Sequence, residues 1–262
     1  MKYAVKKEFT DEELIQRVTD VMEIRNVMGR HAYYHAKGLH EKELKEIWVQ
    51  KPENQKTASF GQNWGYNVGM ERIDAYYGKG SVENAQKDLE ALHGVDATVK
   101  VNQENLGIGS LVIHMLTAPY IEVAADGKTA QGLWYSPGAG GGVHPDHSDG
   151  LMMYEKYGVD FMKEDGEWKI WHLFIGTDFA VPAGRDLKGD TILEQERKIA
   201  AGEMEKPKNP MADCKDPAFI PMDAYSLKYN YSFYPAIPEP YYSFDECVSN
   251  GPEGNPNYKK EG

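Results

Sequence analysis

The sequence has few cysteines, no long apolar run and fewer basic than acidic residues, and each shortage excludes a class of protein. Only two cysteines occur in 262 residues, Cys214 and Cys247, and without CxxC spacing they form neither a disulfide framework nor a cysteine zinc site. No run approaches the ~18 apolar residues of a membrane span, and the first residues lack the apolar stretch of a signal peptide. We therefore expect a cytoplasmic protein with no membrane partner.

The charge balance is acidic, with 41 Asp and Glu against 29 Lys and Arg and a net charge of −12 at pH 7. An acidic surface repels nucleic acid and anionic lipid, so neither is expected as a partner. Hydrophobic residues make up 41% and charged residues 27% of the chain, a composition typical of a globular protein with a sizeable core.

The first part of the chain carries helix signals. Thr10 is followed three residues later by Glu13, which is the capping-box arrangement of a helix start. Apolar residues and two histidines then recur at three- and four-residue steps and predict one long amphipathic helix that ends near Gly38. The expected inner face consists of Leu14, Val18, Val21, Ile24, Met28, His31 and His35. Shorter helices are expected at about 41–49, with Leu44, Ile47 and Trp48 inward, and at 68–77 and 82–93, with a short strand at 57–60.

The second part carries strand signals. Strands are expected at about 110–117, 120–124, 130–135, 151–162 and 168–175. Asp126-Gly127 and Asp165-Gly166 are typical of hairpin turns, so the strands form an antiparallel meander. Helices followed by such a sheet predict an α+β fold. The glycine-rich stretch 136–150 between two strands is interpreted as a loop that acts as a mobile lid or an interface.

The pattern changes beyond Pro182. A charged helix is expected at about 194–204, followed by a segment rich in proline and aromatic residues. Because disordered tails are poor in aromatics, this segment is expected to be ordered. We divide the chain into a domain at 1–178 and a C-terminal extension at 179–262 that packs on the domain or on a partner subunit. The apolar surface left to cover predicts a homodimer or a higher homo-oligomer.

Three parts of the sequence resemble corresponding segments of the nuclear transport factor 2-like superfamily. They are the closing strand Asp165-Gly166-Glu167-Trp168-Lys169-Ile170, the Tyr/His-rich helix end at 30–38, and the pair of segments 114–123 and 130–135. Together they look most like the SnoaL-like branch that includes bile-acid 7-alpha-dehydratase, and more distantly scytalone dehydratase and ketosteroid isomerase. The resemblance covers roughly residues 11–178. It implies a cone-shaped curved sheet wrapped around the N-terminal helices, with a pocket for a small, largely apolar molecule.

The resemblance also implies where a site would lie. The dehydratases of that branch use a histidine on the strand before a proline, and His114 stands at that position. They also use a tyrosine and an aspartate on the first helix. The tyrosine position falls at His31 or Ala32, beside Tyr33 and Tyr34, and the aspartate position falls at Ala36 or Lys37, so that carboxylate is missing here.

The residues themselves allow more than one interpretation. An imidazole such as that of His114, inside an apolar strand, can transfer a proton near pH 7 or can be a core histidine bonded to a backbone carbonyl. His31 and His35 lie on one helix face at HxxxH spacing, but no clear third ligand is nearby, so we expect no metal and no other cofactor. His144, Asp146 and His147 could bind a metal, but their loose spacing is only weak evidence for a metal site.

Aromatic and polar residues near these histidines complete the expected site. One of Tyr33 and Tyr34 is expected to face inward and hold a developing oxyanion. His172 is expected to share a strand face with Trp168, Ile170 and Phe174, because strand side chains alternate. Substrate-binding side chains are expected at Tyr33, His35, Trp64, Trp134 and Phe174.

These expectations predict a cofactor-independent lyase of the dehydratase kind, or an isomerase, acting on a small hydrophobic ring compound that is steroid-like or polyphenolic. His114 would transfer the proton, His31 or Tyr34 would assist the leaving oxygen, and His172 would orient the site. A non-catalytic small-molecule-binding module is the first alternative. A metal-dependent oxygenase that uses His31, His35 and loop histidines is the second.

Overall fold

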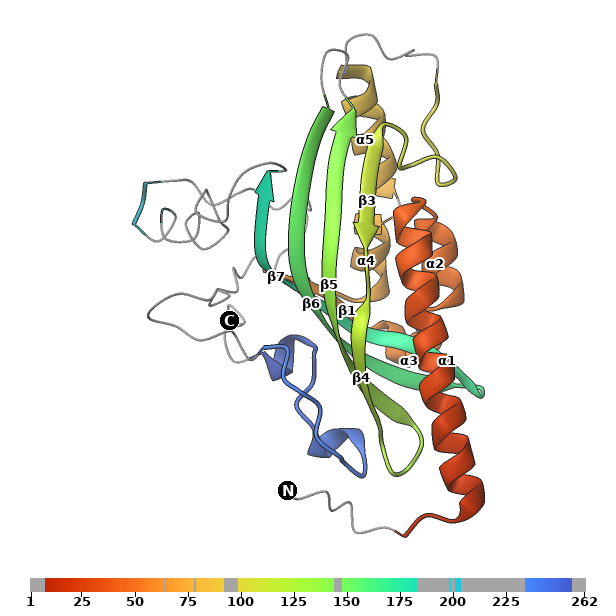
Figure 1. Ribbon diagram of the computed structural model, residues 1–262. Helices are drawn as coiled ribbons and strands as arrows, with labels where there is room; N and C mark the ends of the chain where they lie inside the picture. Colours follow the sequence, from red (N-terminus) through yellow and green to blue (C-terminus); the bar gives the residue numbers. More distant parts are fainter. Residues whose placement is uncertain are drawn as a thin grey trace.

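The computed structural model describes residues 8–63, 65–77, 79–91, 99–143, 148–182, 198, 201–203 and 234–255. A long curved sheet carries the N-terminal helices on one face and a C-terminal segment against the other (Figure 1). The core lies between the helices and the sheet, so side chains from both can meet there.

The first helix, α1, spans Asp11–Ala36 and begins with the predicted capping box between Thr10 and Glu13. Ile24, Val27 and Met28 are buried in its second half. The expected inner face is wrong in the first half, where Leu14 is 49% and Val18 is 67% exposed. The apolar spacing continues through these first turns, but no described element covers that side of them.

Four shorter helices follow. They are α2 at His40–Glu46, α3 at Pro52–Gln55, α4 at Met70–Tyr77 and α5 at Lys79–Ala91. As predicted, Leu44, Ile47 and Trp48 are buried. The predicted helix start at residue 68 is displaced, because Val68 ends a strand that pairs with its neighbour before α4 begins.

The sheet has seven strands: β1 Ser59–Gln62, β2 Gly65–Val68, β3 Ser110–His114, β4 Thr117–Val123, β5 Thr129–Val143, β6 Ser148–Glu164 and β7 Glu167–Pro182. Their order is β2-β1-β7-β6-β5-β3, and β4 also pairs with β5. β1 pairs with β7 in parallel, and the other pairs are antiparallel. The predicted α+β class, with a curved sheet and N-terminal helices, is confirmed.

The glycine-rich stretch 136–150 is strand where the structure describes it, so the expected loop is wrong. β5 continues through it to Val143 and pairs with β3 on one side and β6 on the other. A Cβ on Gly138 would lie 2.7 Å from the carbonyl oxygen of Ile113, and one on Gly140 would lie 3.1 Å from Met153. Because Gly138 and Gly140 have no side chain, β3 and β6 can approach β5 closely at these positions. Residues 144–147, with His144, Asp146 and His147, lie outside the described residues.

A β-bulge in β7 reverses the expected faces of its middle residues. Asp160 of β6 pairs with His172, but the next residue, Phe161, pairs with Ile170, so β7 holds one extra residue. The alternation of β7 side chains between the two faces of the sheet is interrupted at that point. Trp168 and Ile170 remain in the core between helices and sheet, whereas Phe174 packs in a separate cluster with Tyr66 and Tyr234.

The described C-terminal segment, residues 234–255, lies against the face of the sheet opposite the helices (Figure 1). It contains two 3-10 turns at Phe244–Glu246 and Pro252–Gly254. The carbonyls of Tyr241 and Tyr242 accept hydrogen bonds from Ala125 and Asp126 in the β4–β5 turn. Most of the predicted helix at 194–204 lies outside the described residues. None of the described helices is long and apolar enough to cross a bilayer.

Candidate functional site

Half of the eight histidines of the chain gather in one place between the helices and the sheet. His31 and His35 come from α1, His40 from α2 and His114 from β3. The ring centre of His35 lies 5.8 Å from that of His31, 5.0 Å from that of His40 and 5.3 Å from that of His114. These four side chains are called the histidine cluster below.

Local sequence explains why α2 contributes to the cluster. Gly38 follows α1 with φ of 69°, a left-handed conformation that glycine adopts without strain, and the chain turns back there. His40, Glu43, Leu44 and Ile47 then stand at i, i+3, i+4 and i+7, which is one face of a helix. All four are buried. The polar members of this stripe are therefore carried inward with its apolar members.

Glu43 is the buried carboxylate at the centre of the α1–α2 contact. Its Oε1 lies 2.7 Å from Nδ1 of His31 and accepts a 3.4 Å hydrogen bond from the indole of Trp48. Its Oε2 lies 3.7 Å from Nδ1 of His40. Burial alone would raise the pKa of Glu43, but His31 and His40 outweigh it and hold that pKa well below its usual range. Glu43 is therefore ionised at neutral pH.

A second carboxylate approaches the cluster from the sheet. Nδ1 of His114 lies 3.0 Å from Oε2 of Glu155 on β6, close enough for an ion pair but not aligned for a hydrogen bond. The other oxygen of Glu155 accepts a hydrogen bond of 3.0 Å from the hydroxyl of Thr177 on β7. Glu155 is thus fixed by one strand while it faces the histidine of another.

His35 lies in the middle of the cluster. Burial lowers its pKa well below the usual value, and the neighbouring imidazoles oppose a further positive charge, so the ring is neutral at pH 7. Two tyrosine rings border the cluster. The ring centre of Tyr77 lies 5.8 Å from that of His35, and the ring centre of Tyr157 lies 5.9 Å from that of His31. Burial raises the pKa of both phenols, which remain protonated.

Several polar atoms in this buried region have no hydrogen-bond partner among the described residues. They include Nδ1 of His35, of His40 and of His114, Oε2 of Glu43 and of Glu155, and the hydroxyl of Tyr77. A buried polar atom without a hydrogen-bond partner costs about 1–3 kcal/mol, so a group of them in a native protein needs a partner such as ordered water, an ion or a bound small molecule. The arrangement combines ionised carboxylates with a neutral imidazole, which suits proton transfer or ligation.

The structure brings together three of the histidines singled out in the sequence, but not the two tyrosines beside them. His31, His35 and His114 do come together. Neither tyrosine faces inward: Tyr33 is 73% exposed, and the hydroxyl of Tyr34 donates a 2.6 Å hydrogen bond to Glu46. The helix turns by about 100° per residue, so Tyr33 lies about 200° around the helix from His31, whereas Tyr34 lies only about 60° away and its hydroxyl is taken up by Glu46 of α2.

The expected places of His172 and Phe174 are also wrong, because of the bulge in β7. His172 lies 2.8 Å from Asp160 and 3.2 Å from the hydroxyl of Ser249, under the C-terminal segment. Phe174 packs against the rings of Tyr66 and Tyr234 in the separate cluster. Trp134 is buried in the main core beside Phe161, and Trp64 lies outside the described residues.

Sequence reasoning misses His40, Glu43 and Glu155, although a signal for each is present. His40 and Glu43 share the apolar stripe of α2, and Glu155 begins the alternation of Glu155, Tyr157, Val159 and Phe161 on β6. A charged residue at an inward position of such a pattern indicates function. The expectation of no metal near His31 and His35 rests on a missing third ligand, and that reason is wrong because His40 and Glu43 stand beside them.

A surface hollow of about 410 Å³ lies elsewhere on the protein. Its lining comes from α3, β2 and the start of α4 and includes Lys56 and Arg72. It contains none of the residues of the histidine cluster. The chemistry-bearing side chains are therefore those of the buried cluster.

Comparison with known proteins gives a family match. The model of the SnoaL-like domain matches residues 16–173, more than half of the chain. No protein of curated function matches by sequence.

Similar solved structures include three chains. One is a nuclear transport factor 2-like protein from Salmonella enterica serovar Typhimurium (18% identity, 66% of this chain and 99% of that one, TM-score 0.42). Another is hexachlorocyclohexane dehydrochlorinase LinA-type3 from Novosphingobium barchaimii (16%, 68% and 98%, 0.41). The third is an NTF2-like protein with a cystatin-like fold from Novosphingobium aromaticivorans (13%, 71% and 96%, 0.41).

Proposed function

This chain belongs to the SnoaL-like domain family, and on that premise we propose that it is a lyase of the dehydratase kind, or an isomerase, in which the histidine cluster moves a proton on a small hydrophobic ring compound. The observation that carries the proposal is the pairing of His114 with a buried carboxylate, since Nδ1 of His114 lies 3.0 Å from Oε2 of Glu155.

His114 is the proposed proton-transfer group. Glu155 lies 3.0 Å from its Nδ1, where a carboxylate would stabilise the imidazolium formed when the other ring nitrogen takes a proton. Thr177 holds that carboxylate in place. In the elimination, the electron pair of the broken C–H bond forms the new double bond, the C–O bond breaks, and the departing oxygen leaves as water after taking a proton.

The surroundings of His114 favour an apolar ring substrate. Tyr77 and Tyr157 are buried and lie against the cluster, and their rings offer flat apolar surface with a phenolic proton at one end. His31, held by Glu43, would assist the departing oxygen. A substrate enclosed here is removed from water, which strengthens each electrostatic contact with it.

Hydrogen–deuterium exchange tests the proposal because it detects proton abstraction even where no product accumulates. The protein is incubated in D₂O with hydroxylated aromatic and steroid-like compounds, and NMR follows loss of the C–H signal and formation of product. We expect His114→Ala to lower the rate by about 10²–10⁴-fold and to leave binding, measured by calorimetry, nearly unchanged.

Met115→Ala is the matched control, since the side chain of this neighbouring residue is 52% exposed. It should retain full turnover. Wild-type turnover in the His114→Ala protein would remove His114 from the mechanism. Binding of a ring compound with neither exchange nor product would instead identify a non-catalytic binding module.

A further inference from the structure

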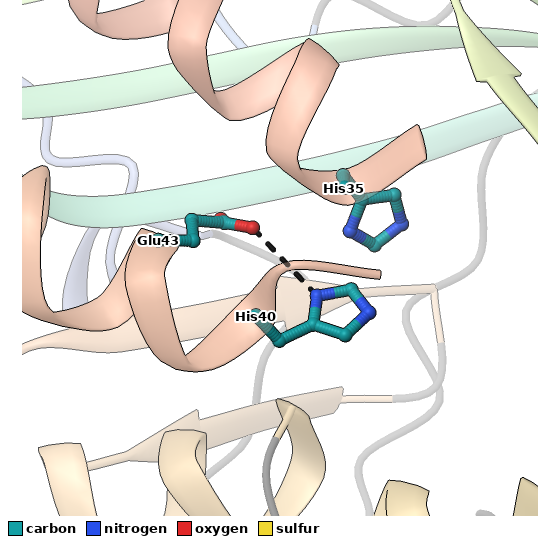
Figure 2. Close-up of side chains that lie close together, drawn as sticks. All are labelled: His35, His40 and Glu43. Atoms are coloured by element: carbon teal, nitrogen blue, oxygen red, sulfur yellow. Dashed lines mark ion pairs between the residues drawn. The ribbon is translucent and has the colours of Figure 1, made fainter. Parts of the chain in front are cut away.

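His35, His40 and Glu43 converge on one point at the junction of α1 and α2. One ligand-type atom from each lies within 4.8 Å of the others, and Figure 2 shows the two rings and the carboxylate turned toward a common space. Glu43 is fully buried and His40 nearly so. Two imidazoles and a carboxylate are a common ligand set for a transition metal.

The partners of these three residues leave the ligand atoms available. Glu43 uses Oε1 for His31 and Trp48, and its Oε2 has no hydrogen-bond partner among the described residues. Nδ1 of His35 and Nδ1 of His40 likewise accept or donate no hydrogen bond among the residues that the structure describes. The hydrogen bond from His31 to the opposite oxygen is the outer contact that orients a ligating carboxylate in known metal sites.

The spacing fits an ion of small radius. Bonds of about 2.0–2.1 Å in a tetrahedral site place ligand atoms about 3.3 Å apart. Nδ1 of His40 and Oε2 of Glu43 are separated by 3.7 Å, close to that value. The remaining separations, at most 4.8 Å, are closed by small side-chain rotations.

We propose that His35, His40 and Glu43 bind one divalent transition-metal ion, with His31 as the residue that orients Glu43. Imidazole nitrogen favours Zn²⁺ or Fe²⁺ over Mg²⁺ and Ca²⁺, which prefer oxygen ligands. This inference goes beyond the proton-transfer proposal and does not depend on it, because binding of the ion is measured without substrate.

Metal titration of the full-length protein tests the site directly. The protein is dialysed against a chelator, which is then removed, and Zn²⁺, Mg²⁺ and, without oxygen, Fe²⁺ are added in calorimetry. We expect one equivalent of Zn²⁺ or Fe²⁺ to bind and Mg²⁺ not to compete. Co²⁺ should give the strong visible absorption of a four- or five-coordinate site with nitrogen ligands. The absence of saturable binding by Zn²⁺, Fe²⁺ and Co²⁺ would overturn the proposal.

Substitutions assign the ion to these residues. His40→Ala and Glu43→Gln should weaken Zn²⁺ binding by more than about 100-fold, and His31→Gln by about 10–100-fold. Glu41→Gln, the same change at an exposed position of α2, should leave the affinity unchanged. Circular dichroism checks that each variant is folded.

The wild-type protein provides a second measurement in case a variant fails to fold. In ¹⁵N NMR spectra that report histidine ring nitrogens, Zn²⁺ should shift the signals of His35 and His40. Shifts confined to other histidines would overturn the assignment. So would a loss of affinity in a His144→Ala, His147→Ala protein with unchanged affinity in His40→Ala.

Discussion

Replacement of Asp160 by asparagine tests how the C-terminal segment is held to the sheet. Asp160 is fully buried on β6 and its two oxygens accept from five donors. Oδ1 accepts from the side-chain amides of Gln131 and Asn250, at 2.8 and 2.7 Å. Oδ2 lies 2.8 Å from His172, accepts from the Ser249 hydroxyl at 3.0 Å and accepts from the backbone N–H of Asn250 at 2.8 Å. Three of these five donors belong to the segment, so this one carboxyl group holds Ser249 and Asn250 to the sheet.

The structure sets the size of the effect. Asparagine has nearly the same shape as aspartate, but its side-chain NH₂ group stands where one carboxylate oxygen accepted hydrogen bonds. That NH₂ group would face at least two of the N–H or O–H groups that donate to Asp160. Loss of two hydrogen bonds to a carboxylate costs about 1.5–3 kcal/mol each, and a donor left buried without a partner adds to that cost. We expect Asp160→Asn to lower the free energy of unfolding by about 3–6 kcal/mol. The segment 234–255 should also become sensitive to proteases.

Urea unfolding, followed by tryptophan fluorescence, measures the first effect, and mass spectrometry of a limited trypsin digest measures the second. Asp165→Asn is the control: it makes the same chemical change in the β6–β7 turn, where the side chain is 85% exposed. It should change stability by less than about 0.5 kcal/mol. A loss below about 1 kcal/mol in Asp160→Asn, with the segment still protected, would refute this account. Lower turnover at unchanged stability would instead place Asp160 and His172 in the active site.

Two further predictions concern glycine and cysteine. Gly138→Ala should destabilise the protein by about 1–3 kcal/mol, since the new methyl group would lie 2.7 Å from the carbonyl oxygen of Ile113. Gly29→Ala, inside α1 with no atom within 4 Å of the new Cβ, should stabilise it by about 0.4–1 kcal/mol, and urea unfolding compares the two. Burial raises the pKa of Cys247 to about 12 from 9.0, so iodoacetamide should modify it roughly 1000-fold more slowly at pH 8 in the folded than in the unfolded protein. Peptide mass spectrometry measures this rate, and similar rates in both states would contradict the raised pKa of this half-buried thiol.

Local patterns predict most elements of the fold. The capping box at Thr10, the helical spacing that follows it and the Asp-Gly turn at 165–166 depend on neighbouring residues alone. Both residues of that turn have positive φ, as a tight hairpin turn requires. The glycine-rich stretch after Tyr135 is mistaken for a loop because its strand character comes from pairing with β3 and β6, and no local propensity records such pairing.

Periodicity also accounts for part of the candidate site. The helical spacing of His31 and His35 places both rings on the inner face of α1, and the apolar strand around His114 places that ring nearby. The same logic, applied to the stripe that holds His40 and Glu43, supplies the carboxylate that the first helix lacks.

The amino-acid sequence alone specifies the set of elements and the inward position of several histidines, because both follow from repeats of two and 3.6 residues. Which of those side chains meet depends on the folded chain. The extra residue between Ile170 and His172 in β7 sends His172 and Phe174 to the opposite face of the sheet, and the turn at Gly38 folds α2 back so that Glu43 reaches His31. Such contacts join residues distant in the chain and depend on the path of the backbone in space, which periodicity does not contain.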